Sequence, residues 1–149
     1  LQKKTFLATP VAAGLVSRPG VNLVNAPSIA KQAGITLTTS HDSKPTEPAC
    51  VRVAVQGHVF TGTVGAGGSG VLLAIDDAHF GVAGVSMEGN VVLVHSKDAT
   101  NSVAAIAAAA SKSGANILGL AVGVGSAGVW SLLRTSVPVN LQVPGAQVF

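Results

Sequence analysis

Residues 89–135 carry the clearest pattern of secondary structure in the chain and read GNVVLVHSKDATNSVAAIAAAASKSGANILGLAVGVGSAGVWSLLRT. The run 91–94 holds only Val and Leu, which is typical of a buried strand. Apolar residues then recur at helical spacing and predict a helix from about 101 to 113. Two apolar runs, 117–122 and 129–135, flank a glycine-rich turn and predict a hairpin. The order strand, helix, strand, strand is that of the start of a ferredoxin-like unit.

The residues that follow are too few to complete such a unit in the usual way. A ferredoxin-like unit closes with a second helix and a fourth strand, but only residues 137–149 remain, and they include Pro138 and Pro144. Proline removes a helical hydrogen bond and clashes with the preceding turn. We therefore expect a βαββ domain over 89–149 with a shortened end, in which the closing helix is vestigial or absent.

The preceding part is predicted to combine a small sheet with short helices. Pro27 suits the first turn of a helix and Gly34 the left-handed position just past its end, so residues 26–33 are expected to be helical. The other predicted elements are a short helix that starts at Pro10 within the apolar stretch 5–16, and strands at 35–39, 50–55, 59–64 and 71–75. The chain is thus predicted to be α+β, with a small mixed sheet-plus-helix domain at 1–88 followed by the ferredoxin-like domain at 89–149.

Composition and charge exclude several classes of protein. Of the 149 residues, 48% are hydrophobic and 10% are charged, which rules out a disordered tail. The basic residues are scattered and the net charge is only +3, so nucleic acid is not an expected partner. The single cysteine, Cys50, cannot form an intramolecular disulfide, which favours a reducing, cytoplasmic setting. The chain opens with Leu1, and we interpret it as a piece of a longer protein.

One uncharged stretch, from Gly114 to Leu133, is as long as a membrane span. It is rich in glycine, however, and the run 123–128 supplies turn residues in its middle. Two strands joined by a hairpin explain this stretch better, so we expect no membrane segment.

No motif for catalysis or for metal binding emerges. The glycine-rich loop 65–70 is followed by a strand, whereas a phosphate-binding loop leads into a helix, so a hairpin loop is favoured. Asp76 and Asp77 are interpreted as turn residues and Cys50 as a small buried apolar residue. No Gly-x-Ser-x-Gly elbow is present, and the histidines lack both i, i+4 spacing and a cysteine nearby. We therefore predict no catalytic residue and no metal site. These histidines are His41, His58, His79 and His95.

One polar constellation is suited to holding an amino acid. His95 ends the first strand of the βαββ unit, the loop 96–100 follows, and Asn116 opens the next strand. An Asn amide offers both a donor and an acceptor, and the exposed N–H groups at a helix start favour a carboxylate. In a ferredoxin-like sheet these strand ends can approach a neighbouring copy of the chain. The alternative, a solvated polar strand end without a ligand, has equal weight on the residues alone.

Several segments resemble the C-terminal region of the long-form D-3-phosphoglycerate dehydrogenases. The run Val-Asn-Leu-Val-Asn-Ala at 21–26, then Ala-Gly-Ile at 33–35 and Thr-Thr-Ser-His at 38–41, carry the first part of the resemblance. Residues 50–80 look like the intervening, or allosteric substrate-binding, domain of that family. Residues 90–135 look like its ACT domain, a βαββαβ regulatory module.

The resemblance implies a regulatory role. Enzymes of this family oxidise 3-phosphoglycerate with NAD in the first committed step of serine biosynthesis, and serine can act as a feedback inhibitor at ACT interfaces. This chain has no Rossmann glycine fingerprint and no catalytic His/Glu/Arg set, so we expect it to be inactive by itself and to hold no cofactor, with NAD bound by the parent enzyme. The expected partners are a second copy, as a dimer or tetramer in the cytoplasm, and L-serine.

The resemblance also suggests which residues bind serine. Serine-binding members use a His at the end of the first ACT strand, an Asn two positions later and an Asn that opens the second strand. Here His95 and Asn116 match, whereas Lys97 stands in place of the first Asn and Asp98–Asn101 replace the usual Arg-Pro-Gly. The hypothesis is therefore an L-serine site at His95, Lys97 and Asn116. The alternative is a purely structural assembly domain that has lost its effector.

Overall fold

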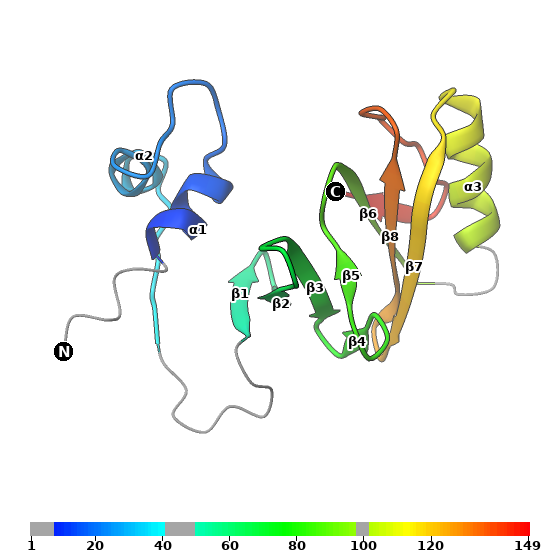
Figure 1. The fold of residues 1–149 in the computed structure, drawn as a ribbon, viewed down its shortest axis with the longest axis horizontal. Helices are drawn as coiled ribbons and strands as arrows, with labels where there is room; N and C mark the ends of the chain where they lie inside the picture. Colours follow the sequence, from blue (N-terminus) through cyan, green and yellow to red (C-terminus); the bar gives the residue numbers. More distant parts are fainter. Residues whose placement is uncertain (1–7, 41–49, 98–101) are drawn as a thin grey trace. The chain divides into compact units, whose positions relative to one another are not determined.

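The computed structural model of the chain describes residues 8–40, 50–97 and 102–149 and divides it into two compact units, 1–48 and 49–149 (Figure 1). The helices are α1 (Ala8–Leu15), α2 (Ala26–Gln32) and α3 (Ser102–Lys112). The strands are β1 (Val51–Val55), β2 (His58–Val64), β3 (Gly70–Ile75), β4 (Ala78–His79), β5 (Val85–Ser86), β6 (Asn90–Ser96), β7 (Ile117–Gly125), β8 (Gly128–Thr135) and β9 (Ala146–Val148).

The first unit consists of two short helices around a small alanine core. Ala12 of α1 and Ala26 and Ala30 of α2 are almost fully buried, and Ile35 and Leu37 pack against them. The strand predicted at 35–39 is wrong, because the described residues of this unit contain no other strand with which it could pair. Its apolar side chains cover the helices instead.

Two asparagines shape the turn that precedes α2. The Asn22 Oδ1 atom accepts hydrogen bonds from the Val24 and Asn25 backbone N–H groups at 2.9 and 3.0 Å. The Asn25 Oδ1 atom accepts one from the Asn22 backbone N–H at 2.8 Å. Pro27 lies in the first turn of α2, and Gly34 follows its end at φ +75°, both as predicted. Residues 21–26 thus form a turn that is stabilised by hydrogen bonds to its own asparagine side chains.

The second unit begins with an antiparallel sheet, sheet A, which is made of β1 to β5 in the order β1-β2-β3-β4 with β5 also paired to β3. The predicted hairpin of 50–55 with 59–64 is confirmed, and its two turn residues, Gln56 and Gly57, both have positive φ. The glycine-rich loop 65–70 joins β2 to the antiparallel β3, so it is the predicted hairpin loop. It does not lead into a helix.

A second antiparallel sheet, sheet B, has the strand order β7-β8-β6-β9. The predicted order of strand, helix, strand and strand is confirmed by β6, α3, β7 and β8. Residues 136–145 contain no helix and lead directly into β9, which pairs antiparallel with the second half of β6. The chain is thus a mixed α/β structure with two antiparallel sheets and three helices among its described residues, compatible with the predicted α+β class.

Sheet B buries both of its faces. One face packs against α3 and against the irregular segment that follows β8, and the other packs against sheet A. The buried residues of the helix-side layer are Val92, Val94, Ile106, Ala110, Leu133, Leu141 and Val143. Those of the layer between the sheets are Leu72, Ile75, Ala78, Phe80, Trp130 and Leu132. The second unit therefore has three layers, in which sheet B lies between sheet A and α3.

The chain passes from sheet A to sheet B between β5 and β6. The domain boundary predicted between residues 88 and 89 falls at this point. Both sheets belong to the same compact unit, so the boundary stays a prediction. In the described parts of the chain, no helix is long and apolar enough to cross a membrane.

Strand β7 approaches sheet A so closely that one of its residues has no room for a side chain. A Cβ atom added at Gly123 would lie 3.0 Å from the His79 carbonyl oxygen and 3.3 Å from the Ala78 carbonyl oxygen. Both are backbone atoms of β4, which cannot rotate away. By contrast, a Cβ atom at Gly119 of the same strand would meet nothing closer than 3.9 Å.

We expect Gly123→Ala to lower the free energy of unfolding by about 1–3 kcal/mol, because the new methyl group pushes the two sheets apart. Gly119→Ala is the matched control and should be neutral or slightly stabilising, since glycine weakens a strand interior. Urea unfolding followed by the fluorescence of the single tryptophan, Trp130, measures both. Equal effects of the two substitutions would show that β7 does not pack on β4 as described.

Candidate functional site

A histidine–aspartate pair lies at the corner of sheet A. The His58 Nδ1 atom is 2.8 Å from the Asp76 Oδ2 atom, and both side chains are largely buried, at 23% and 28% exposed. The Asp76 Oδ1 atom accepts a hydrogen bond from the Val59 backbone N–H at 2.8 Å. Asp76 has φ +54°, a left-handed conformation that Asp tolerates better than most residues, and it is the turn residue that the sequence predicts. The carboxylate thus fixes the orientation of the imidazole.

These contacts lower the pKa of Asp76 below its ordinary value of 3.8. Burial raises the pKa of this carboxyl, but the hydrogen bonds from the Val59 backbone and the His58 side chain, together with the charge of His58, more than offset that effect. The pKa of Asp77 is lowered as well, chiefly because its carboxylate accepts a hydrogen bond from the Ser126 backbone N–H at 2.8 Å. Asp77 therefore links the β3–β4 turn to the β7–β8 turn.

Trp130 is the centre of an aromatic cluster that joins the two sheets. The His95 ring stacks on the indole with centroids 4.5 Å apart and planes 19° apart. His58 meets the same indole edge-on at 5.0 Å, and the Phe149 ring lies 5.5 Å from it. The two imidazoles are 5.8 Å apart. Trp130 is only 2% exposed, so the centre of the cluster is buried between β2, β6 and β8, while Phe149, the residue after β9, is 48% exposed.

His95 is held tightly at the end of β6. Its Nε2 atom is buried and has no hydrogen-bond partner in the part of the chain that the structure describes. A Cβ atom at Gly128, which has φ +132°, would lie 3.3 Å from this nitrogen and 2.5 Å from the Ser96 carbonyl oxygen. Glycine at the start of β8 thus leaves the space that the imidazole occupies.

The three residues predicted to bind serine do not meet within one copy of the chain. His95 is paired with Trp130, which is paired in turn with Gly123 of β7, whereas Asn116 precedes the first residue of β7. The strand between positions 116 and 123 spans about 23 Å at a rise of about 3.3 Å per residue. His95 and the exposed Lys97 therefore lie at one end of sheet B, and Asn116 lies at the other.

The surroundings of these residues also differ. The backbone of Asn116 exchanges hydrogen bonds with Ser136, and its side chain is exposed. The loop residues Asp98–Asn101, which belong to the predicted ligand loop, lie outside the described residues.

The remaining candidate groups stay apart. No group of three or more His, Cys, Asp or Glu side chains could hold a metal ion within residues 8–40, 50–97 and 102–149. His79 is exposed on β4, Cys50 is half-buried and forms no disulfide, and His41 lies outside the described residues.

The structure reveals an apolar surface that the sequence reading did not identify. The edge strand β7 exposes Ile117, Leu118, Val122 and Val124, and it contains no charged residue. Helix α3 lies beside β7 (Figure 1), exposes Val103 and small alanines, and carries Lys112 as its only charge. We call this the β7–α3 surface. The uncharged stretch from Gly114 to Leu133 is the sequence feature that could have indicated this surface. It could not show that β7 lies at a sheet edge, because that depends on the strand order.

No protein-family model matches this chain, and a search of curated proteins finds no match. The resemblance to the D-3-phosphoglycerate dehydrogenases therefore rests on the quoted residues alone.

We expect Asp76→Asn to destabilise the chain at neutral pH by about 1–2 kcal/mol, because it removes the charged partner of His58. A carboxyl with a lowered pKa stabilises the fold above pH 3.8, its unfolded value, and that contribution is lost as the pH falls through the lower, folded value. The difference between wild type and variant should thus become smaller toward the acid end. Asparagine keeps the preference for positive φ, so backbone strain does not interfere. Urea unfolding between pH 7 and pH 3 measures the difference, and a constant difference would contradict the pairing.

Proposed function

We propose that this chain is a regulatory and assembly region of a D-3-phosphoglycerate dehydrogenase, with an intervening domain at 1–88 and an ACT-like domain at 89–149. The parent enzyme would oxidise 3-phosphoglycerate with NAD in the cytoplasm, for L-serine biosynthesis. The chain itself would contribute self-association, as a dimer or tetramer, and an effector site for L-serine. Its role is thus to couple the assembly of the enzyme to the concentration of the end product.

The strand order supports the ACT-like assignment. A ferredoxin-like unit places its fourth strand beside the first and its third between the first and the second. The order β9-β6-β8-β7 has this arrangement, and α3 connects β6 to the parallel β7 across one face of the sheet. The segment 136–145 replaces the second helix, and its apolar residues Val139, Leu141 and Val143 cover the same face.

The observation that carries the proposal is the β7–α3 surface. Exposed strand edges pair readily with other strands, and soluble proteins usually block them with charged residues, proline or bulges. Strand β7 is nine residues long and carries no charge, and Val124 at its end is 69% exposed. Two copies that pair through β7 form a continuous eight-stranded sheet, and the alanines of α3 allow the two helices to approach closely. An interface between copies is therefore the role that this surface fits.

Such pairing also supports the serine site. In an antiparallel pair of β7 strands, the start of one strand lies beside the end of the other. Asn116 of one copy is thereby brought to the end of sheet B where Lys97 and His95 of the second copy lie. A carboxylate and an ammonium group on one small ligand would match the Lys97 ammonium and the Asn116 amide.

One observation favours the purely structural alternative. The His95 imidazole is stacked on Trp130 and its Nε2 atom is buried, so this ring is already engaged inside the copy to which it belongs. A domain that only assembles the enzyme needs the β7–α3 surface but no free imidazole. Both hypotheses thus predict self-association, but only the regulatory one predicts serine binding.

We expect Val124→Lys to shift the chain from dimer or tetramer to monomer, because a charge buried within an apolar strand pair is costly to desolvate. Val64→Lys is the matched control, since Val64 is 72% exposed on sheet A and lies away from the β7–α3 surface. Light scattering at several protein concentrations gives the mass of each. A wild-type monomer, or an unchanged oligomer in Val124→Lys, would overturn the proposed interface.

We expect L-serine, but not D-serine, to give a saturable calorimetric signal with the oligomer. Asn116→Ala should weaken that signal at least tenfold, because it removes both hydrogen-bonding groups of the amide. At a concentration 100 times the dissociation constant, L-serine should add about 2.7 kcal/mol to the stability of the fold. A stable oligomer without any calorimetric signal would support the structural alternative.

The chain alone should show no turnover with NAD and 3-phosphoglycerate, and detectable turnover would contradict the whole assignment.

A further inference from the structure

Strand β7 separates its side chains by size between the two faces of sheet B. Leu120 packs into the layer beside α3, whereas Ala121 packs into the layer between the two sheets. Side chains alternate along a strand, so every second residue shares the face of one of these two. The face toward α3 carries Leu120, Val122 and Val124, and the face toward sheet A carries Gly119, Ala121 and Gly123.

Ile117 belongs to the face toward α3 as well. The pairing of β7 with β8 is irregular at this point, because Leu118 is an extra residue that the ladder skips. Ile117 lies opposite Thr135, which is two residues after Leu133 on β8. Leu133 packs beside α3, and directly paired residues share a face, so Ile117 points to the α3 side.

The backbone groups of β7 that face away from β8 can be identified from the other side of the sheet. Leu93 of β6 exchanges backbone hydrogen bonds with Phe149 at 3.1 and 2.8 Å, so its groups turn away from Leu132, its partner on β8. Leu132 therefore directs its own groups to β7, where Ala121 is opposite. The residues on either side of Ala121 consequently turn their N–H and C=O groups to the open edge.

The same alternation extends along the whole strand. The Asn116 carbonyl oxygen accepts a hydrogen bond from the Ser136 backbone N–H at 3.0 Å, so Asn116 faces β8 and the next residue faces the open edge. The residues with outward backbone groups are thus also the large aliphatic ones on the α3 face. We call them the β7 row, which consists of Ile117, Leu120, Val122 and Val124.

Pairing of β7 with β7 of a second copy restricts the position of the twofold axis. Residues with outward groups must lie opposite one another, so the axis can pass through Leu120, Ala121 or Val122. An axis at Leu120 leaves Val124 without a member of the β7 row opposite it, and an axis at Val122 leaves Ile117 without one. With the axis at Ala121, Leu120 lies opposite Val122 and Ile117 opposite Val124, so every member is matched.

We propose that β7 pairs antiparallel with β7 of a second copy in the register that places Ala121 on the twofold axis. This inference rests on the proposed self-association and specifies its contact. An isologous contact requires a patch that is complementary to itself. Here large aliphatic side chains meet one another on the α3 face, glycine and alanine meet on the other face, and no charge is buried because β7 carries none.

Disulfide cross-linking of single-cysteine variants of the 149-residue chain tests this register. Cys50→Ser removes the native thiol, and Ala121→Cys then places one thiol of each copy beside the axis. The two Cα atoms are expected about 4.5 Å apart, within the range of about 4.4–6.8 Å that a disulfide needs. Oxidised glutathione converts the two thiols into one disulfide and is itself reduced to two molecules of glutathione. We expect a covalent dimer on a denaturing gel.

Leu120→Cys and Val122→Cys, each with Cys50→Ser, are the matched controls. In the proposed register each of these positions lies diagonally across from its own copy, at about 7–8 Å, which is outside the range for a disulfide. We therefore expect about tenfold less covalent dimer from either variant than from Ala121→Cys. The fluorescence of Trp130 shows whether each variant is folded.

A mixture of two variants tests the register without touching the layer between the sheets. Ile117 and Val124 are 40% and 69% exposed, so cysteine at either position does not disturb the core. Chains with Ile117→Cys and chains with Val124→Cys should cross-link when mixed, because these positions lie opposite each other. Neither variant should cross-link alone, since each is about 20 Å from its own copy along the strand.

The outcomes separate the register from the self-association on which it rests. A dimer by light scattering that cross-links best through Leu120→Cys or Val122→Cys, or through none of these variants or mixtures, would overturn the register and leave the self-association standing. A monomeric wild type would overturn both. A covalent dimer from Ala121→Cys and from the mixture would establish the proposed pairing.

Discussion

The packing of sheet A onto sheet B around Trp130 is the contact on which the second unit depends. This indole is 2% exposed and lies in the layer with Leu72, Ile75 and Leu132. Its rim is made of polar rings, since His95 stacks on it and His58 meets it edge-on. The carboxylate of Asp76, in sheet A, orients the His58 imidazole. The hydrogen bond between these two side chains therefore supports the apolar packing around Trp130.

Close packing, both between the sheets and within sheet B, explains why glycine occurs at two positions. Gly123 brings β7 against the backbone of β4, and Gly128 leaves room for His95 at the start of β8. Asp77 adds a hydrogen bond to the β7–β8 turn at the same end of the sheets. The two sheets are thus held at their contact by burial, by close backbone approach and by a turn-to-turn hydrogen bond. This combination accounts for one compact unit where two domains were expected to meet.

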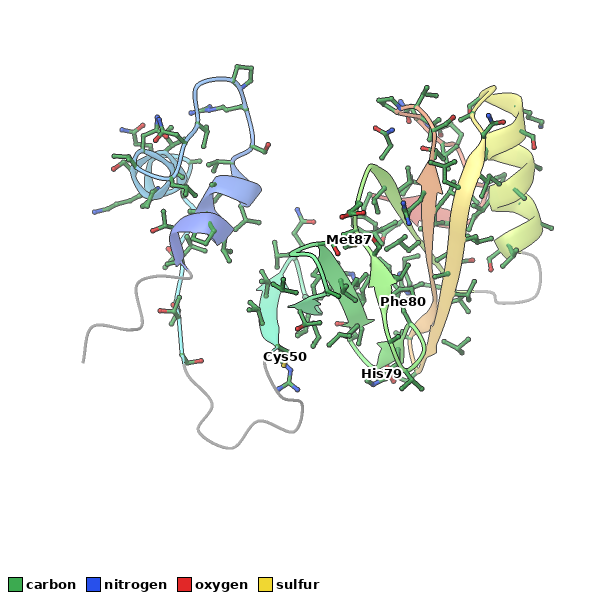
Figure 2. All side chains as sticks on the ribbon, viewed as in Figure 1. Cys50, His79, Phe80 and Met87 are labelled. Carbon is green, nitrogen blue, oxygen red and sulfur yellow. The ribbon has the colours of Figure 1, made fainter. Side chains whose placement is uncertain are left out.

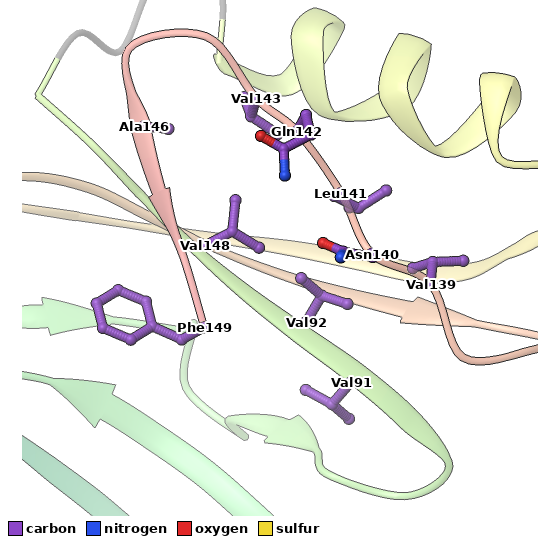
Figure 3. Close-up of a pocket in the computed structure, with 10 residues that line it drawn as sticks. All are labelled: Val91, Val92, Val139, Asn140, Leu141, Gln142, Val143, Ala146, Val148 and Phe149. Carbon is purple, nitrogen blue, oxygen red and sulfur yellow. The ribbon is translucent and has the colours of Figure 1, made fainter.

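On its other face, sheet B is covered by less structure than a complete ferredoxin-like unit would supply. Helix α3 covers one part, and the irregular segment 139–143 covers the rest with three apolar side chains. A segment without helical hydrogen bonds leaves gaps, and the pocket between this segment and β9 is one of them (Figure 3). Sheet B therefore offers two different edges. Strand β7 is long and carries no charge, with a register irregularity between Ile117 and Gly119, whereas the opposite edge strand, β9, is short and borders the pocket.

Local sequence determines some features of this chain, whereas others depend on the whole fold, in which side chains from distant segments pack together (Figure 2). Proline and glycine positions, the β-rich runs and the helical spacing of 103–110 were sufficient to predict both α1 and α2, the hairpins and the βαββ order, because these features act within a few residues. The strand predicted at 35–39 failed, since β-branched residues form a strand only where a partner edge exists. The partners of His58 and His95 were equally inaccessible, because they lie on other strands and become neighbours only when the sheets stack. The sequence by itself thus determined the longer elements and their order along the chain, but not the short strands β4, β5 and β9. Only the tertiary structure decided that β7 lies at a sheet edge, that His95 stacks on Trp130, and that Asn116 lies at the opposite end of the sheet. Strand order and sheet packing are set by contacts between residues far apart in sequence.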